Sequence, residues 1–165
     1  MVTKVIGAIL DQVKKELGAA SAYYDLDMWA SYSGYEGFQD FCKNSAPEEM
    51  THARKFLKYV VDYYDTPVVF PGMPGALRTE TPTSLSSAVK QVLALELSVT
   101  SAIKKLAQLA REEAETETAI WIEKTFLIEQ IRSVAQLREF DRLLDLAGDD
   151  VAAIMRVDHY IGKNA

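Results

Sequence analysis

A chain of 165 residues and 18.4 kDa can bury a substantial core without disulfides or a structural metal, and we expect residues 1–165 to form one domain. The hydrophobic fraction of 48%, the charged fraction of 25% and a mean hydropathy of -0.06 are typical of a water-soluble globular protein. A net charge of -6 argues against nucleic acid as a partner, because phosphate backbones are bound by clustered Lys and Arg. Cations are the more natural ligands of so acidic a chain.

Export and membrane insertion are not expected. The apolar stretch VIGAIL near the N-terminus is closed by Asp11 and lacks a cleavage-type segment, so we predict no signal peptide and a cytoplasmic protein. The longest uncharged run, TPVVFPGMPGAL, is too short for a bilayer and contains prolines and glycines. The single cysteine, Cys42, cannot form an internal disulfide, and beside Phe38 and Phe41 it is expected to be a small core residue.

Glycine and proline are distributed very unevenly, and the long stretches without them predict an all-α protein. In chain order, the expected helices span about residues 4–33, 37–64, 84–112 and 117–147, and a short fifth helix follows Gly148. The turn SGYEG separates the first two helices, and a long connection at 65–83 separates the second from the third. No glycine or proline marks the break between the third and fourth helices. Helix length alone places it within REEAETETA, with Thr116 as a possible N-cap.

Pro47 lies inside the second expected helix, where SAPE resembles a capping box that would begin a new helix at Ser45. We favour one kinked helix, because helical spacing of the inward residues continues across the proline. Four helices of roughly 28 residues would each be about 40 Å long, which is the format of a four-helix bundle. A connection as long as 65–83 predicts a crossover that runs the length of this bundle.

Polar residues interrupt the apolar stripes of these helices. In the third helix, Glu96 is the only carboxylate within a stripe of seven apolar residues. An ionised carboxylate in a core is costly, so it must be protonated, paired or bound to a cation. Glu16 interrupts the first helix in the same way. The second helix carries Glu49 and His52 three positions apart, hence on one face, and the fourth carries Gln130.

These polar positions recur at nearly equal intervals in the two predicted hairpins, so four helices bring them to one height in the bundle. The polar layer then contains three carboxylates, one imidazole and one amide. An oxygen-rich set with a single nitrogen suits iron(II) or manganese better than a thiolate-seeking metal. Inward-facing sets of this kind form carboxylate-bridged di-metal sites in bundles.

At these residues the sequence resembles the bacterial-type non-haem ferritins, members of the ferritin-like di-iron superfamily. The resemblance extends from about residue 5 to 161 and includes the long connection and the short terminal helix. It is carried by QVKKELGAASAYY in the first helix, EEMTHARKF in the second, ALELSVTSAI in the third and IEQIRS in the fourth.

The resemblance implies a di-iron ferroxidase centre that oxidises Fe(II) with dioxygen, and a cage of 24 identical subunits that stores the ferric mineral. Glu16, Glu49 and His52 would bind the first iron, with Glu49 as the bridge. Glu96 would bind the second iron, and Gln130 would orient water or dioxygen. Tyr23, two helical turns after Glu16, matches the tyrosine beside the family's centre and is a candidate electron donor.

Two departures from the family pattern concern further ligands. Arg132 and Ser133 stand where some bacterial ferritins carry carboxylates for a third iron, which leaves Glu48 and Glu129 as the remaining candidates. Met50 occupies the position of the haem-ligating methionine of bacterioferritins, but the second ExxH motif of those proteins is absent. We therefore expect Met50 to be a packing or interface residue, and no haem.

Two other residues have weaker assignments. The resemblance gives Glu123 a place in the iron-entry channels, although a boundary glutamate is an equal alternative, and His159 on the last helix is expected to contact solvent or an interface. Two alternatives to a non-haem ferritin use the same layer: a discrete di-iron oxidase or peroxidase of the rubrerythrin type, and a haem-binding bacterioferritin. A metal-free bundle would have to bury Glu16, Glu49 and Glu96 together, which charge repulsion opposes unless they are protonated.

Overall fold

The computed structural model describes residues 2–75 and 80–165. Its elements are α1 (Lys4–Ser33), α2 (Glu36–Tyr64), α3 (Leu85–Glu112), α4 (Thr116–Ile122), the π-helix η1 (Glu123–Leu127), α5 (Ile128–Ala147) and α6 (Val151–Lys163). The α4, η1 and α5 segments follow one another directly and correspond to the predicted fourth helix. The predicted all-α fold is therefore confirmed, with helix ends close to those expected.

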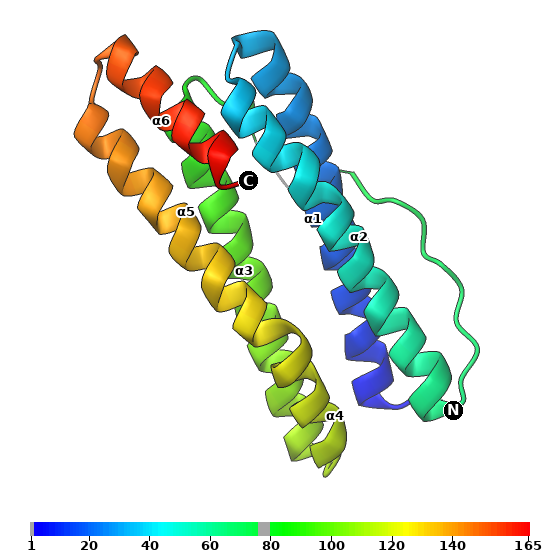
Figure 1. Ribbon diagram of the computed structural model, residues 1–165. Coiled ribbons are helices and arrows are strands. Elements are labelled where there is room, and N and C mark those ends of the chain that lie inside the picture. Colours follow the sequence, from blue (N-terminus) through cyan, green and yellow to red (C-terminus); the bar gives the residue numbers. More distant parts are fainter. Residues whose placement is uncertain (1, 76–79) are drawn as a thin grey trace.

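The four long helices form a bundle made of two antiparallel pairs (Figure 1). One pair is α1 with α2, and the other is α3 with the continuous α4–η1–α5 helix. The described parts of the connection, residues 65–75 and 80–84, run from the end of α2 back along the α1–α2 pair. Helix α3 therefore begins at the opposite end and runs parallel to α2. This confirms the predicted crossover, apart from its residues 76–79, which lie outside the described part of the chain. Among the described helices, none is both long and apolar enough to cross a membrane.

Local sequence accounts for several of the helix ends. Thr3 caps α1, since its hydroxyl oxygen accepts a hydrogen bond from the Ile6 amide at 3.2 Å. Gly34 ends α1 in the left-handed conformation, at φ 81°, which a glycine adopts without steric cost. Ser84 and Ser87 form a reciprocal capping box at the start of α3.

The second helix is continuous through Pro47, as expected. The Ser45 hydroxyl donates to the Phe41 carbonyl at 2.9 Å, so it bonds within the helix and does not cap a new one. The Thr51 hydroxyl donates to the Pro47 carbonyl in the same way, at 3.0 Å. The alternative of a helix that starts at Ser45 is therefore wrong.

The break between α3 and α4 differs from the expectation at Thr116. That residue is the first residue of α4 and not its cap, while the capping position belongs to Glu115, whose side chain makes no capping bond. The turn is made by Ala114, at φ 61°, and the Glu115 amide donates to the Ala110 carbonyl at 2.7 Å. An alanine in the left-handed region is uncommon, which is why no turn residue marked the break in the sequence.

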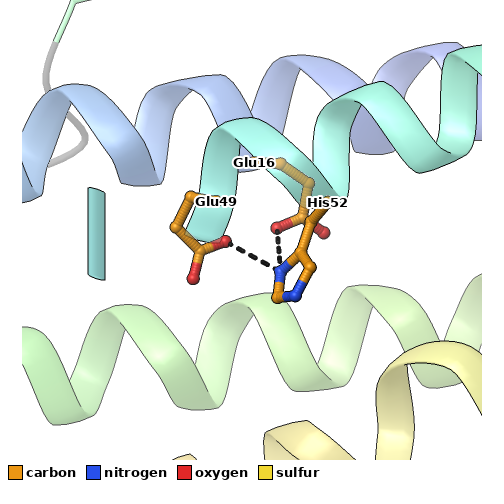
Figure 2. A group of neighbouring side chains, drawn as sticks. All are labelled: Glu16, Glu49 and His52. Atoms are coloured by element: carbon orange, nitrogen blue, oxygen red, sulfur yellow. Dashed lines mark ion pairs between the residues drawn. The ribbon is translucent and has the colours of Figure 1, made fainter. Parts of the chain in front are cut away.

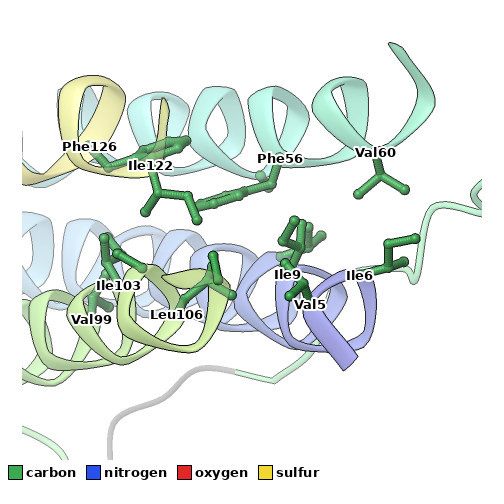
Figure 3. Close-up of a cluster of buried hydrophobic side chains, with 14 of the residues drawn as sticks. Val5, Ile6, Ile9, Phe56, Val60, Val99, Ile103, Leu106, Ile122 and Phe126 are labelled. Atoms are coloured by element: carbon green, nitrogen blue, oxygen red, sulfur yellow. The ribbon is translucent and has the colours of Figure 1, made fainter. Parts of the chain in front are cut away.

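Two apolar clusters fill the bundle, one toward each end. The first contains buried residues from the beginning of α1, the ends of α2 and α3, and the α4–η1 region, and Figure 3 shows its large side chains. The second contains the end of α1, the beginnings of α2 and α3, and parts of α5 and α6, and it includes the buried Cys42. The candidate polar residues lie at intermediate chain positions, so they form a layer between the two clusters.

The short helix α6 crosses one end of the bundle and packs against α2 (Figure 1). It caps the N-terminus of α2. No side chain of α2 itself caps its N-terminus. The buried Asp158 carboxylate of α6 accepts hydrogen bonds from the amides of Gly37 and Phe38, both at 2.9 Å. The two helices approach so closely that a Cβ at Gly37 would lie 1.8 Å from the Asp158 carbonyl oxygen. Glycine is therefore required there for this contact.

Replacing Asp158 with alanine is expected to lower the free energy of unfolding by about 2–4 kcal/mol, because two buried amides lose a charged acceptor. Calorimetric melting of the purified variant would measure this loss. Asp149→Ala, at an exposed position between α5 and α6, is the matched control. Equal melting temperatures for the two variants would contradict the capping role of Asp158.

Candidate metal centre

The polar layer consists of side chains that four helices turn toward the bundle axis. Its five predicted members are all at least 95% buried: Glu16 from α1, Glu49 and His52 from α2, Glu96 from α3 and Gln130 from α5. Such burial is rare for carboxylates, which are usually solvated unless a charged partner or a metal compensates them.

Glu16, Glu49 and His52 form a compact group that has the composition of a metal site (Figure 2). One potential ligand atom from each residue lies within 4.8 Å of the others. His52 Nδ1 is 3.4 Å from Glu49 Oε2 and 4.0 Å from Glu16 Oε2. Two carboxylate oxygens and an imidazole nitrogen converging on one point are suitable ligands for a divalent cation such as Fe(II).

Three of the candidate ligands also make polar contacts with side chains outside the layer. The Gln12 amide donates to Glu16 Oε1 at 2.7 Å, and the Tyr23 hydroxyl donates to Glu96 Oε1 at 2.5 Å. On the far side of the imidazole, His52 Nε2 lies 3.3 Å from Glu129 Oε2. Outer contacts of this kind orient metal ligands and restrict their rotation.

In four of the five members of the layer, one buried nitrogen or oxygen atom has no hydrogen-bond partner. These orphaned atoms are Glu16 Oε2, Glu49 Oε2, Glu96 Oε2 and His52 Nδ1. Leaving a buried acceptor unpaired costs about 1–3 kcal/mol, so four in one layer indicate a missing electropositive partner. A cation bound among Glu16, Glu49 and His52 would satisfy three of them, and a second cation beside Glu96 would satisfy the fourth.

The carboxyl groups of the layer are electrostatically unfavourable in the absence of such a cation. Burial, followed by the charge of Glu49, raises the pKa of Glu16 well above its usual range. Burial also raises the pKa of Glu96, although hydrogen bonds from Tyr23 and Gln130 oppose that shift. The raised pKa values favour the protonated carboxyl groups, so a metal that binds here competes with protons.

Tyr23 and Gln130 lie at the Glu96 side of the layer. Burial and the charges of Glu96 and Glu49 raise the pKa of Tyr23, so its hydroxyl keeps its proton and remains a donor. Gln130 Oε1 accepts a hydrogen bond from the Thr100 hydroxyl at 3.3 Å, which fixes the orientation of the amide. The structure thus brings both residues to the second half of the candidate centre.

Glu48 and Glu129 are together on the outer side of His52 but are more exposed than the layer. The Glu129 side chain is 44% exposed, and its charge, after burial, contributes to the raised pKa of Glu48. Arg132 is exposed, while the Ser133 hydroxyl donates to the Glu129 backbone carbonyl at 3.2 Å.

The other residues singled out in the sequence lie away from the layer. Met50 packs against the first apolar cluster. Glu123 is partly exposed and pairs with Arg111 at 2.6 Å, which compensates the charge expected to attract cations. His159 is exposed on α6.

Gln12 and Thr100 are two contributors that sequence reasoning missed. Gln12 is one turn before Glu16 on the inward face of α1, and Thr100 is one turn after Glu96 on α3. A search for polar residues one turn from each buried carboxylate would have found both.

Comparisons with known proteins place this bundle in a family. The model of the ferritin-like domain matches residues 6–147. The chain belongs to the ferritin family. Among its relatives, the bacterial non-haem ferritin of Staphylococcus haemolyticus is 30% identical over 146 residues, which cover 88% of this chain and 86% of that protein. The bacterial non-haem ferritin of Staphylococcus aureus strain MRSA252 is 26% identical over 163 residues, covering 96% and 93%.

The solved structures agree with this ferritin assignment at the level of the fold. A structure described as an engineered closed form of the Archaeoglobus fulgidus ferritin superposes with a TM-score of 0.87. It covers 98% of this chain and 96% of that one, at 23% identity. The bundle, the crossover and the short terminal helix of this chain are therefore those of a ferritin.

Proposed function

We propose that this ferritin oxidises Fe(II) with dioxygen at the polar layer and stores the ferric product inside a shell of subunits. The observation that supports this most directly is the set of four buried, unpartnered ligand atoms, contributed by Glu16, Glu49, Glu96 and His52. Oxidation raises the charge of the iron, and an anionic layer stabilises the higher charge more strongly. The layer would thus favour Fe(III) over Fe(II).

We infer two iron positions from the way the residues are grouped. Glu16 and His52 would bind the first Fe(II), since their free atoms converge with that of Glu49. Glu96, held by Tyr23, would bind the second, with Gln130 beside it for water or dioxygen. Glu49 contacts His52 and is also influenced by the charge of Glu96, so it would bridge the two ions. Each Fe(II) gives one electron to dioxygen.

The outer residues have secondary roles in this proposal. Glu48 and Glu129 would contact iron transiently as it passes between the layer and the outer side of His52. Tyr23, whose hydroxyl donates to Glu96, would act as an additional electron donor beside the iron pair. We propose a cytoplasmic shell of 24 identical subunits by analogy with the family, with Fe(II) and dioxygen as substrates and no haem.

Anaerobic loading with Fe(II), followed by air, tests this function on the purified assembly after its mass has been measured by light scattering. A large shell should oxidise about two Fe(II) per subunit rapidly and then keep many more ferric ions in solution. A small oligomer that stops at two and precipitates the rest would instead support a discrete di-iron oxidase. Haem absorbance in the protein as purified would support a bacterioferritin.

A further inference from the structure

A continuous series of aromatic rings leads from the candidate metal centre to the surface of the bundle. It starts at His52, whose ring packs edge-on against Phe126 with centroids 5.5 Å apart. Phe126 stacks on Phe56 at 4.1 Å, and Figure 3 shows these two rings within the first apolar cluster. Both rings are fully buried.

The next rings are ones that can be oxidised. Trp121 lies edge-on to Phe126 at 5.4 Å and stacks on Tyr59 at 3.8 Å. Tyr59 stacks in turn on Tyr63 at 5.0 Å. Tyr63 is 49% exposed, so the series ends in solvent at the surface of the subunit. We call Trp121, Tyr59, Tyr63 and Tyr64 the aromatic chain.

The aromatic chain also lies beside groups that can accept the protons released by oxidised tyrosines. The Tyr64 hydroxyl donates to the Glu115 carboxylate and lies 3.0 Å from the Thr118 hydroxyl. The Tyr59 hydroxyl lies 3.0 Å from the same Thr118 oxygen. Tyr64 packs edge-on against both Tyr59 and Tyr63. A carboxylate within hydrogen-bond reach can take a phenolic proton as the electron leaves.

We propose that the aromatic chain conducts electrons from Fe(II) at the surface to the metal centre, which completes the reduction of dioxygen to water. The inference rests on the proposed ferroxidase function. Two Fe(II) at the centre reduce dioxygen only as far as hydrogen peroxide. Trp121 and Tyr59 then supply two further electrons in succession, the O–O bond breaks, and two waters form with protons from solvent.

Each oxidised ring is reduced by an electron from the neighbouring ring that lies nearer the surface. Tyr64 passes its phenolic proton to Glu115 when it is oxidised, and Tyr59 passes its proton to the same carboxylate through the Thr118 hydroxyl. The exposed Tyr63 releases its proton to solvent. Each phenol regains a proton on reduction. Fe(II) at the exposed Tyr63 ends the sequence by becoming Fe(III). In sum, four Fe(II), one dioxygen and four protons give four Fe(III) and two waters. The subunit thereby releases no peroxide beside its iron.

The iron-to-dioxygen ratio tests this proposal. The wild type should consume one dioxygen per four Fe(II) without releasing peroxide. Trp121→Phe and Tyr59→Phe, which keep an aromatic ring at each position, should oxidise the first two Fe(II) at the wild-type rate. They should then consume one dioxygen per two Fe(II) and release about one hydrogen peroxide per dioxygen. Tyr32→Phe, at a 94% exposed position on α1, is the matched control and should behave as the wild type.

Two outcomes of the ratio measurement would overturn the proposal. One is that both Trp121→Phe and Tyr59→Phe still oxidise four Fe(II) per dioxygen without releasing peroxide. The other is that the wild-type protein itself releases peroxide. Tyr23 is the competing donor, because it contacts Glu96 directly. Electron paramagnetic resonance during Fe(II) oxidation separates the two donors. A tyrosyl radical that survives Trp121→Phe and Tyr59→Phe but is absent in Tyr23→Phe would show that the aromatic chain is not the path.

Pulse radiolysis of the metal-free protein tests the chain independently of iron chemistry. The experiment uses a Trp29→Phe background, since Trp29 also stacks on a tyrosine, Tyr35. One-electron oxidation should form an indolyl radical at Trp121 that decays as a tyrosyl radical appears, at a rate independent of protein concentration. Tyr59→Phe should slow this transfer at least tenfold. An unchanged rate of radical transfer in Tyr59→Phe would overturn the proposal that the aromatic chain conducts electrons. Failure of the ferroxidase proposal would be seen separately, as an absence of rapid dioxygen consumption.

Discussion

Replacing Glu49 with glutamine is expected to reduce the rate of rapid Fe(II) oxidation on the order of 100-fold or more. The reason is that Glu49 lies between the two halves of the layer, beside His52 and within the electrostatic range of Glu96. Loss of an outer-shell partner alone typically costs 10–100-fold in metal affinity or activity, so loss of a bridging charge should cost at least as much. A neutral amide also stabilises Fe(III) less than a carboxylate does.

Stopped-flow absorbance of ferric species on the assembled protein would measure this rate. Glu36→Gln makes the same chemical change at an exposed position on the same helix and should leave the rate unchanged. A Glu49→Gln protein that retains the rapid phase would remove Glu49 from the proposed centre. Light scattering of both variants ensures that the comparison is made between intact assemblies.

The same substitution is expected to stabilise the metal-free protein. Burial and the neighbouring charge of Glu96 raise the pKa of Glu49 from 4.5 to about 8, which means that the folded state binds this proton more tightly than the unfolded chain does. The stability that this proton contributes is fully present below pH 4.5 and is lost as the pH rises toward 8. Glutamine is neutral at every pH and avoids that loss.

Calorimetry in the presence of a chelator should therefore show the largest difference at pH 8. There, Glu49→Gln should be more stable than the wild type by roughly 2–4 kcal/mol, an increase of about 5–10 °C in melting temperature. Near pH 4 the two proteins should melt within about 1 °C of each other, provided that both remain assembled. A variant that is less stable at pH 8 would show that Glu49 has a compensating partner in the metal-free protein.

Together, these two expectations describe a site whose ligands reduce stability until metal is bound. The unpartnered atoms of Glu16, Glu49, Glu96 and His52 are the structural basis of that cost. Binding of a cation to the folded state alone would recover it by mass action. Substitutions that relieve such strain commonly increase stability at the expense of activity.

Much of the fold was predictable because strong local signals mark the helix ends. The first helix was expected at 4–33 and is observed there, since Thr3 and Gly34 define its ends. The layer was predictable for a different reason. Polar side chains in otherwise apolar stripes are costly, so their positions carry information that a surface glutamate does not.

The features that were missed lack a local signature. The π-helix Glu123–Leu127 contains no glycine or proline, so no residue in it signals the change from the α-helical period. Ala114 takes the left-handed turn conformation that a glycine would have indicated. The aromatic chain joins α2 with α4, and only the tertiary structure brings Tyr59 against Trp121.

The contact between Asp158 and the start of α2 has a consequence for synthesis on the ribosome. The two partners are 120 residues or more apart in the sequence, so α6 is translated after all four long helices. The α1–α2 hairpin can form early from its own local contacts, but its second helix lacks an acceptor for two amides until α6 emerges. The nascent bundle is thus finished by its last helix, and an interrupted translation product would carry an incomplete end on the surface where α6 should dock.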